Sequence, residues 1–232
     1  MRFAILFAIG FVVCLGGIHE FCRAQGLQPG VVIDSTLGRG FYVTHACDPT
    51  QDFNTARLDY LDFDFAASAA SIRRGAERLR ESLGDATDRS RQALLNSVAE
   101  LEALAKATEQ RRIENVKRLD EAFARANYAL AQRHYYSALL AREQMAQARV
   151  GEELRRSAEY LQRARQQVGL QLQDNEAAAI DRTRALSSKL ASGLNATSDE
   201  ITNELHSFGQ GLANLRDKLG GRTTENGQPI QR

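Results

Sequence analysis

The stretch from Asp85 to Leu219 contains no proline and is dominated by alanine, leucine, glutamate, glutamine and arginine. Proline removes an amide donor and breaks helices, whereas most of the dominant residues are strong helix formers. Only 7% of the chain is aromatic and tryptophan is absent, so single leucines and alanines supply most apolar groups. This composition predicts long amphipathic helices rather than a compact enzyme fold.

Apolar residues recur in this stretch at helical spacing. The clearest series, here called the seam, alternates steps of four and three residues as in a coiled coil: Ile201, Leu205, Phe208, Leu212, Leu215 and Leu219. One helix over residues 85–219 would reach about 200 Å at ~1.5 Å per residue, so we expect the chain to fold back. Gly151, between Arg149 and Glu152, is the expected turn, and Asp174 is the alternative. The predicted fold class is all-α, an extended coiled-coil-like hairpin or a small helical bundle.

A first helix is predicted over residues 49–84, because Asp48 can cap free amides and Pro49 suits the first helical turn. Gly84 then ends it. A second break is predicted at Gly193, after which Thr197 and Glu200 can form a capping box.

The first 24 residues have the pattern of a secretory signal: Arg2, a short apolar run and small residues before a cleavage site after Ala24. An uncleaved membrane anchor is the alternative. Residues 25–48 contain short β-prone runs, and residues 220–232 form a polar tail that we expect to be disordered. The sequence therefore predicts export to a periplasm or to the extracellular space. The Asn195 glycosylation triplet has meaning only in a eukaryotic secretory pathway.

Removal of the leader leaves Cys47 as the one remaining cysteine. An intramolecular disulfide is then excluded, so Cys47 either forms a disulfide with another chain or is buried and inert.

The motifs of common catalytic and cofactor sites are missing. After the leader the histidines stand at 45, 134 and 206, without the spacing of a metal site. No phosphate-binding loop, dinucleotide motif or nucleophile elbow occurs. Lys and Arg total 30 against 29 Asp and Glu, which argues against a nucleic-acid partner. We expect no enzymatic activity, cofactor, metal or small-molecule substrate.

One group of side chains is a candidate partner-binding patch, because tyrosine is enriched in interface cores. It consists of Tyr128, His134, Tyr135, Tyr136 and Tyr160. The alternative is that these rings fill wide layers between helices.

Together these features predict an exported, non-enzymatic interaction or scaffold protein that associates with itself or with another helical protein through coiled coils. One alternative is an amphipathic lipid-surface binder like the exchangeable apolipoproteins, although alanine beside each large apolar residue makes a thin lipid-binding face. Another alternative is a holdase chaperone that cradles clients between helical arms.

Overall fold

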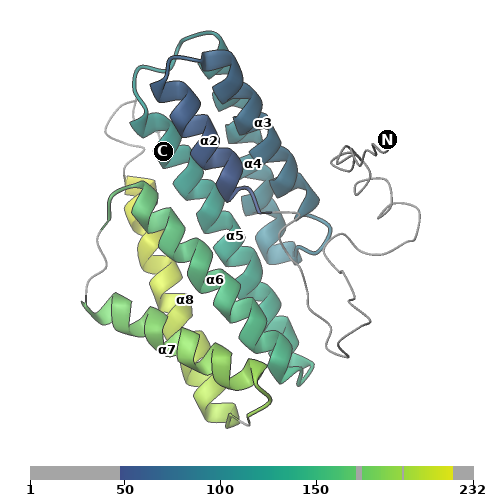
Figure 1. Cartoon of the computed structure of the whole chain (residues 1–232). Coiled ribbons are helices and arrows are strands. Elements are labelled where there is room, and N and C mark those ends of the chain that lie inside the picture. Colours follow the sequence, from purple (N-terminus) through teal and green to yellow (C-terminus); the bar gives the residue numbers. More distant parts are fainter. Residues whose placement is uncertain (1–47, 171–173, 195, 222–232) are drawn as a thin grey trace, which may run out of the picture. The chain divides into compact units, whose positions relative to one another are not determined.

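The computed structural model describes residues 48–170, 174–194 and 196–221, all within one unit of the chain (Figure 1). These residues are 83% helical and contain no strand, which confirms the all-α prediction. The seven helices are α2 (Thr50–Leu61), α3 (Phe65–Glu81), α4 (Asp88–Glu109), α5 (Lys117–Glu143), α6 (Gln147–Gln167), α7 (Asp174–Ala191) and α8 (Ser198–Gly221).

Several predictions fall outside the described residues. They concern the leader over residues 1–24, the β-prone segment up to residue 47, which includes Cys47, and the tail from residue 222. None of the described helices has the length and apolarity needed to cross a membrane.

Helix α5 is the centre of the packing. It contacts α2, α4, α6 and α8, while α3 packs on α2 and α4, and α7 packs on α6 and α8 (Figure 1). Seven of its buried residues are alanines, at positions 122, 124, 126, 129, 131, 138 and 141. Because alanine side chains are small, these positions let the neighbouring helices pack close to α5, and their burial turns this part of the helix toward the interior.

The seam is covered within the chain. Each of its six residues in α8 is exposed by 4% or less, and α8 contacts both α5 and α7. The four-three repeat therefore indicates a buried helix face here, without needing a second chain to cover it.

The prediction of one helix over residues 49–84 is wrong, because α2 and α3 are separate helices. Phe63 has a φ of 63°, and its amide bonds to the Tyr60 carbonyl while the Asp64 amide bonds to Asp59. This pair of hydrogen bonds is the Schellman motif, which closes a helix at a left-handed residue. Asp64 then caps α3 by accepting a hydrogen bond from the Ala67 amide.

The predicted turn at Gly151 is also wrong, since Gly151 lies inside α6. The chain reverses instead after α5, where Met145 has a φ of 56° and the Met145 and Ala146 amides form a Schellman pair. Arg111 ends α4 in the same way, with a φ of 54°. The long stretch consequently forms five helices rather than two arms.

Gly151 serves close packing. A Cβ atom added there would lie 2.8 Å from the Leu190 Cβ and 2.9 Å from the Ser187 carbonyl oxygen of α7. The missing side chain therefore allows α6 and α7 to approach each other.

The two predicted breaks at glycines do separate helices. The chain leaves α3 before Gly84, and Gly193 has a φ of 74° after α7. Thr197 and Glu200 form the expected capping box: the Thr197 amide donates to Glu200 and the Glu200 amide donates to the Thr197 hydroxyl.

We predict that Gly151→Ala lowers the free energy of unfolding by about 1–3 kcal/mol, because the added methyl group overpacks the contact with α7. Gly211→Ala is the matched control: its Cβ would meet nothing within 4 Å, so alanine should be neutral or raise stability by up to about 1 kcal/mol. Urea unfolding measures both. Equal effects of the two variants would contradict this role of Gly151.

We predict that Met145→Gly raises the free energy of unfolding by roughly 0.5–1 kcal/mol, because glycine adopts the left-handed conformation without steric cost. The Met145 side chain is 88% exposed, so little packing is lost. Met145→Ala, which keeps the strain, should change stability much less. A glycine variant no more stable than the alanine variant would refute this explanation of the turn.

Candidate functional site

The structure divides the predicted tyrosine patch into two groups. Tyr128, His134, Tyr135 and Tyr136 all belong to α5, and Tyr160 belongs to α6. His134 and Tyr160 stack between α5 and α6, with ring centroids 5.5 Å apart. Tyr135 stands instead against α8, where its ring lies 6.1 Å from that of Phe208.

His134 is the centre of the first group and is only 3% exposed. Its Nδ1 lies 2.7 Å from a carboxylate oxygen of Glu153 on α6. The Arg133 guanidinium approaches the ring, with Nη1 3.1 Å from the His134 Nε2. A neutral imidazole with its proton on Nδ1 satisfies both contacts, because Nδ1–H donates to Glu153 and Nε2 accepts from Arg133.

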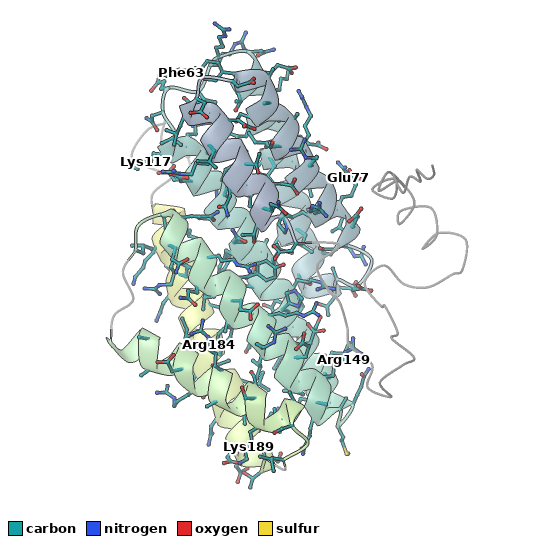
Figure 2. All side chains as sticks on the ribbon, viewed as in Figure 1. Phe63, Glu77, Lys117, Arg149, Arg184 and Lys189 are labelled. Carbon is teal, nitrogen blue, oxygen red and sulfur yellow. The ribbon has the colours of Figure 1, made fainter. Side chains whose placement is uncertain are left out.

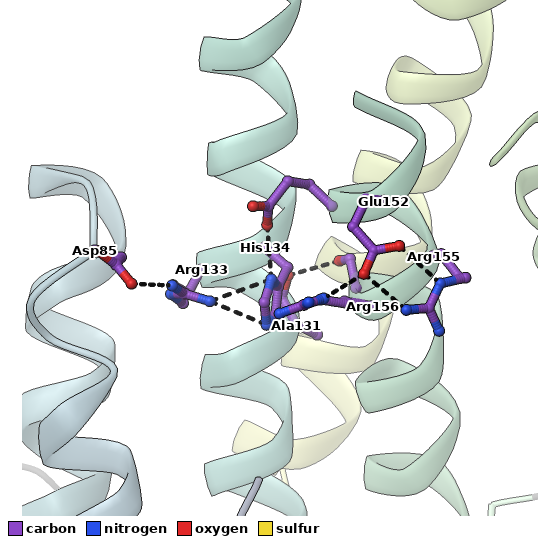
Figure 3. Close-up of polar contacts among 9 residues, drawn as sticks. Asp85, Ala131, Arg133, His134, Glu152, Arg155 and Arg156 are labelled. Atoms are coloured by element: carbon purple, nitrogen blue, oxygen red, sulfur yellow. Dashed lines mark hydrogen bonds and ion pairs between the residues drawn. The ribbon is translucent and has the colours of Figure 1, made fainter. Parts of the chain in front are cut away.

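Further charged residues continue this network (Figure 3). Arg133 also donates to Asp85 in the loop between α3 and α4, at 3.2 Å. On α6, Glu152 accepts hydrogen bonds from Arg155 and Arg156. The network therefore links α5 and α6 to the loop that precedes α4.

The charge states follow from burial and from these neighbours. Burial lowers the pKa of His134, and the nearby Arg133 cation lowers it further. Burial raises the pKa of Glu153, but the hydrogen bond from His134 and the charges of Arg133 and Arg156 outweigh it, so the net direction is downward. A neutral histidine beside an ionised glutamate is the state that this site favours.

The second group fixes α8 on α5. The Tyr135 hydroxyl donates to the Leu205 carbonyl at 3.2 Å, and a Cβ on Gly209 would lie 2.5 Å from that hydroxyl oxygen. Tyr136 lies beside Tyr135, with ring centroids 5.5 Å apart. Tyr128 is partly buried, which raises the pKa of its phenol to about 12.

In this arrangement His134, Tyr135 and Tyr160 join α5 to neighbouring helices, whereas the hydrogen-bond partner of Tyr128 and the ring partner of Tyr136 lie in α5 itself. A substrate could reach His134 only if α5 and α6 separated. Among the described residues no three His, Cys, Asp or Glu side chains gather as a metal site requires. The sequence indicated His134 and Tyr160, but Glu153, Arg133 and Arg156 were missed because their spacing is that of an ordinary solvated helix face.

We predict that the free energy of unfolding falls as the pH drops below about 6.5, the value near which a histidine titrates in an unfolded chain. With the pKa of folded His134 lowered, the unfolded state binds more protons in this range, so acid favours unfolding. The lowered pKa of Glu153 adds a further loss below about 4.5.

Urea unfolding between pH 8 and 5 tests this origin of the pH dependence. His134→Gln, which cannot titrate, should reduce the loss of stability seen on acidification. His206→Gln removes an exposed histidine of α8 and should retain it. A His134→Gln profile parallel to that of the unmodified chain would exclude His134 as the source.

Comparison of the chain with protein-family models, with curated proteins and with solved structures gives no match.

Proposed function

We propose that this chain is an exported, non-enzymatic interaction protein, a small helical bundle that associates with a second copy of itself. Export rests on the pattern of the first 24 residues. The observation that carries the association is an exposed apolar strip on α2 and the turn that follows it, formed by Leu58, Leu61 and Phe63.

Helix α2 is apolar on two sides. Phe53 and Ala56 face inward and are fully buried, whereas Leu58 is 60% and Leu61 45% exposed. Phe63 follows in the turn and is 78% exposed; Figure 2 shows it at one end of the described helices. A large aromatic residue in a left-handed, solvent-exposed position is costly in strain and in hydration. A contact that covers the strip would offset part of that cost.

The charges around the strip favour a second copy as its partner. Asp62 is an exposed carboxylate beside Leu61, and the exposed Arg111 stacks on Phe65 immediately across the α2–α3 turn. The Phe65 ring in turn lies 6.3 Å from that of Phe63, so a carboxylate and a guanidinium both lie near the strip. In a two-fold contact the acid of one copy can meet the base of the other, whereas an anionic lipid surface would meet Asp62 unfavourably.

The burial of the seam disfavours the two alternative functions predicted from the sequence, the lipid-surface binder and the holdase chaperone. A lipid-surface binder needs a wide exposed apolar face, and a holdase needs an open apolar inner surface. The large apolar residues of the seam are instead buried inside the chain, so both functions would require the helices to separate first.

The strip contains three side chains, and so small a contact surface favours a weak, concentration-dependent dimer.

Sedimentation equilibrium of the full chain over a range of concentrations tests the proposal, and we expect a reversible dimer. Leu58→Gln combined with Phe63→Asn should abolish dimerisation without loss of folding, because asparagine tolerates the left-handed conformation. Leu95→Gln is the matched control, since Leu95 is an exposed leucine of α4 outside the strip.

A monomer at all concentrations would refute self-association. Equal weakening by Leu95→Gln would show that the strip is not the contact surface. Flotation of the chain with neutral and anionic vesicles alike would favour the lipid-surface alternative instead.

A further inference from the structure

A cavity of about 420 Å³ lies between α2, α5 and α6. Helices α2 and α6 each pack along α5 (Figure 1). The floor of the cavity is the stacked pair Phe53 and Phe123, whose ring centroids are 4.5 Å apart. Both rings are buried, so the floor of the cavity is apolar. The volume falls in the range of small-molecule sites, roughly 300–1,000 Å³.

The walls carry polar groups with unused hydrogen-bonding capacity. On α2, Arg57 donates through Nε to Asp120 at 2.9 Å, while its two terminal nitrogens have no acceptor in the described part of the chain. On α6, Arg163 uses Nη1 for Asp48 and Thr50, and no described residue accepts a hydrogen bond from its Nη2. These guanidinium groups line the cavity from opposite helices.

Side-chain amides complete the walls. Asn54 of α2 and Gln166 of α6 are exposed lining residues and have no side-chain hydrogen bond to any other described residue. Gln167 accepts a hydrogen bond from Asn127 through Oε1, and its NH₂ group donates to no other residue that the structure describes. Side chains of α2 and α6 thus place hydrogen-bond donors and acceptors along the lining of one cavity.

The ion pairs that line the cavity indicate which class of ligand it can bind. Arg57 is paired with Asp120, and Arg163 is paired with Asp48 at 3.0 Å. An anion would have to compete with these carboxylates, and a cation with the guanidinium groups. An uncharged ligand with several hydroxyl groups can instead donate to Asp120 and accept from the arginines and amides while both ion pairs remain intact.

We propose that this cavity binds a small uncharged polyhydroxyl compound, a monosaccharide or disaccharide, through Asn54, Arg57, Asp120, Arg163, Gln166 and Gln167. This ligand site is independent of the proposed dimer. It lies on the part of α2 that precedes the exposed strip.

Two-dimensional NMR of the ¹⁵N-labelled full chain tests the site, because it resolves side-chain NH₂ groups. The probes are glucose, galactose and maltose, with glycine and inorganic phosphate as charged comparisons. The NH₂ signals of Asn54, Gln166 and Gln167 should shift saturably with at least one sugar. The signal of Asn96 on α4 should not move.

Variants locate the binding. Asn54→Ala combined with Gln166→Ala should weaken sugar binding about tenfold or more, because at least two neutral hydrogen bonds are lost. Asn96→Ala, which removes an exposed amide far from the cavity in sequence and on another helix, should leave the affinity unchanged.

Three results would overturn the proposal. Shifts with glycine or phosphate but with no sugar would assign the cavity to a charged ligand. No shift with any probe would exclude the site, and unchanged sugar affinity in the double variant would place binding elsewhere.

Discussion

The packing of four helices, α2, α4, α6 and α8, against α5 is the constraint on which the rest of the structure depends. Thirteen of the 27 residues of α5 are buried, and small alanines at many of these positions allow neighbours to approach closely. Conformational entropy opposes such order, so the apolar area removed from water has to stabilise it. Helices α4, α6 and α8 each pack against this helix and carry buried leucines.

Polar groups between α5 and α6 restrict how these two helices can pair. The His134–Glu153 contact and the hydrogen bond from Ser157 to the Ala131 carbonyl are both lost if one helix slides along the other. In the described part of the chain Arg133 Nε is buried without a hydrogen-bond partner. The network therefore carries a desolvation cost while it restricts how α5 and α6 pair. Buried ionic groups often contribute more to a unique arrangement than to stability.

Local signals made part of the fold predictable from sequence. The seam and the Thr197–Glu200 capping box depend on spacings of three and four residues within one helix, and both features are present. Phe63, Arg111 and Met145 were missed as turns because glycine normally occupies the left-handed position. Gly151 was misassigned because close packing also requires glycine. The pairing of His134 with Glu153 depends on the register of α5 against α6, which no local pattern encodes.

The exposed turn at Met145 has a consequence for chemical durability. Met145 is the one sulfur-containing residue among those described, since the other methionine and all three cysteines lie within residues 1–47. Its thioether points into solvent, and conversion to a sulfoxide there would place a polar group in water rather than in the core. Among the described residues, the buried side chains are leucine, alanine, phenylalanine and others without sulfur, so they offer oxidants no sulfur to attack.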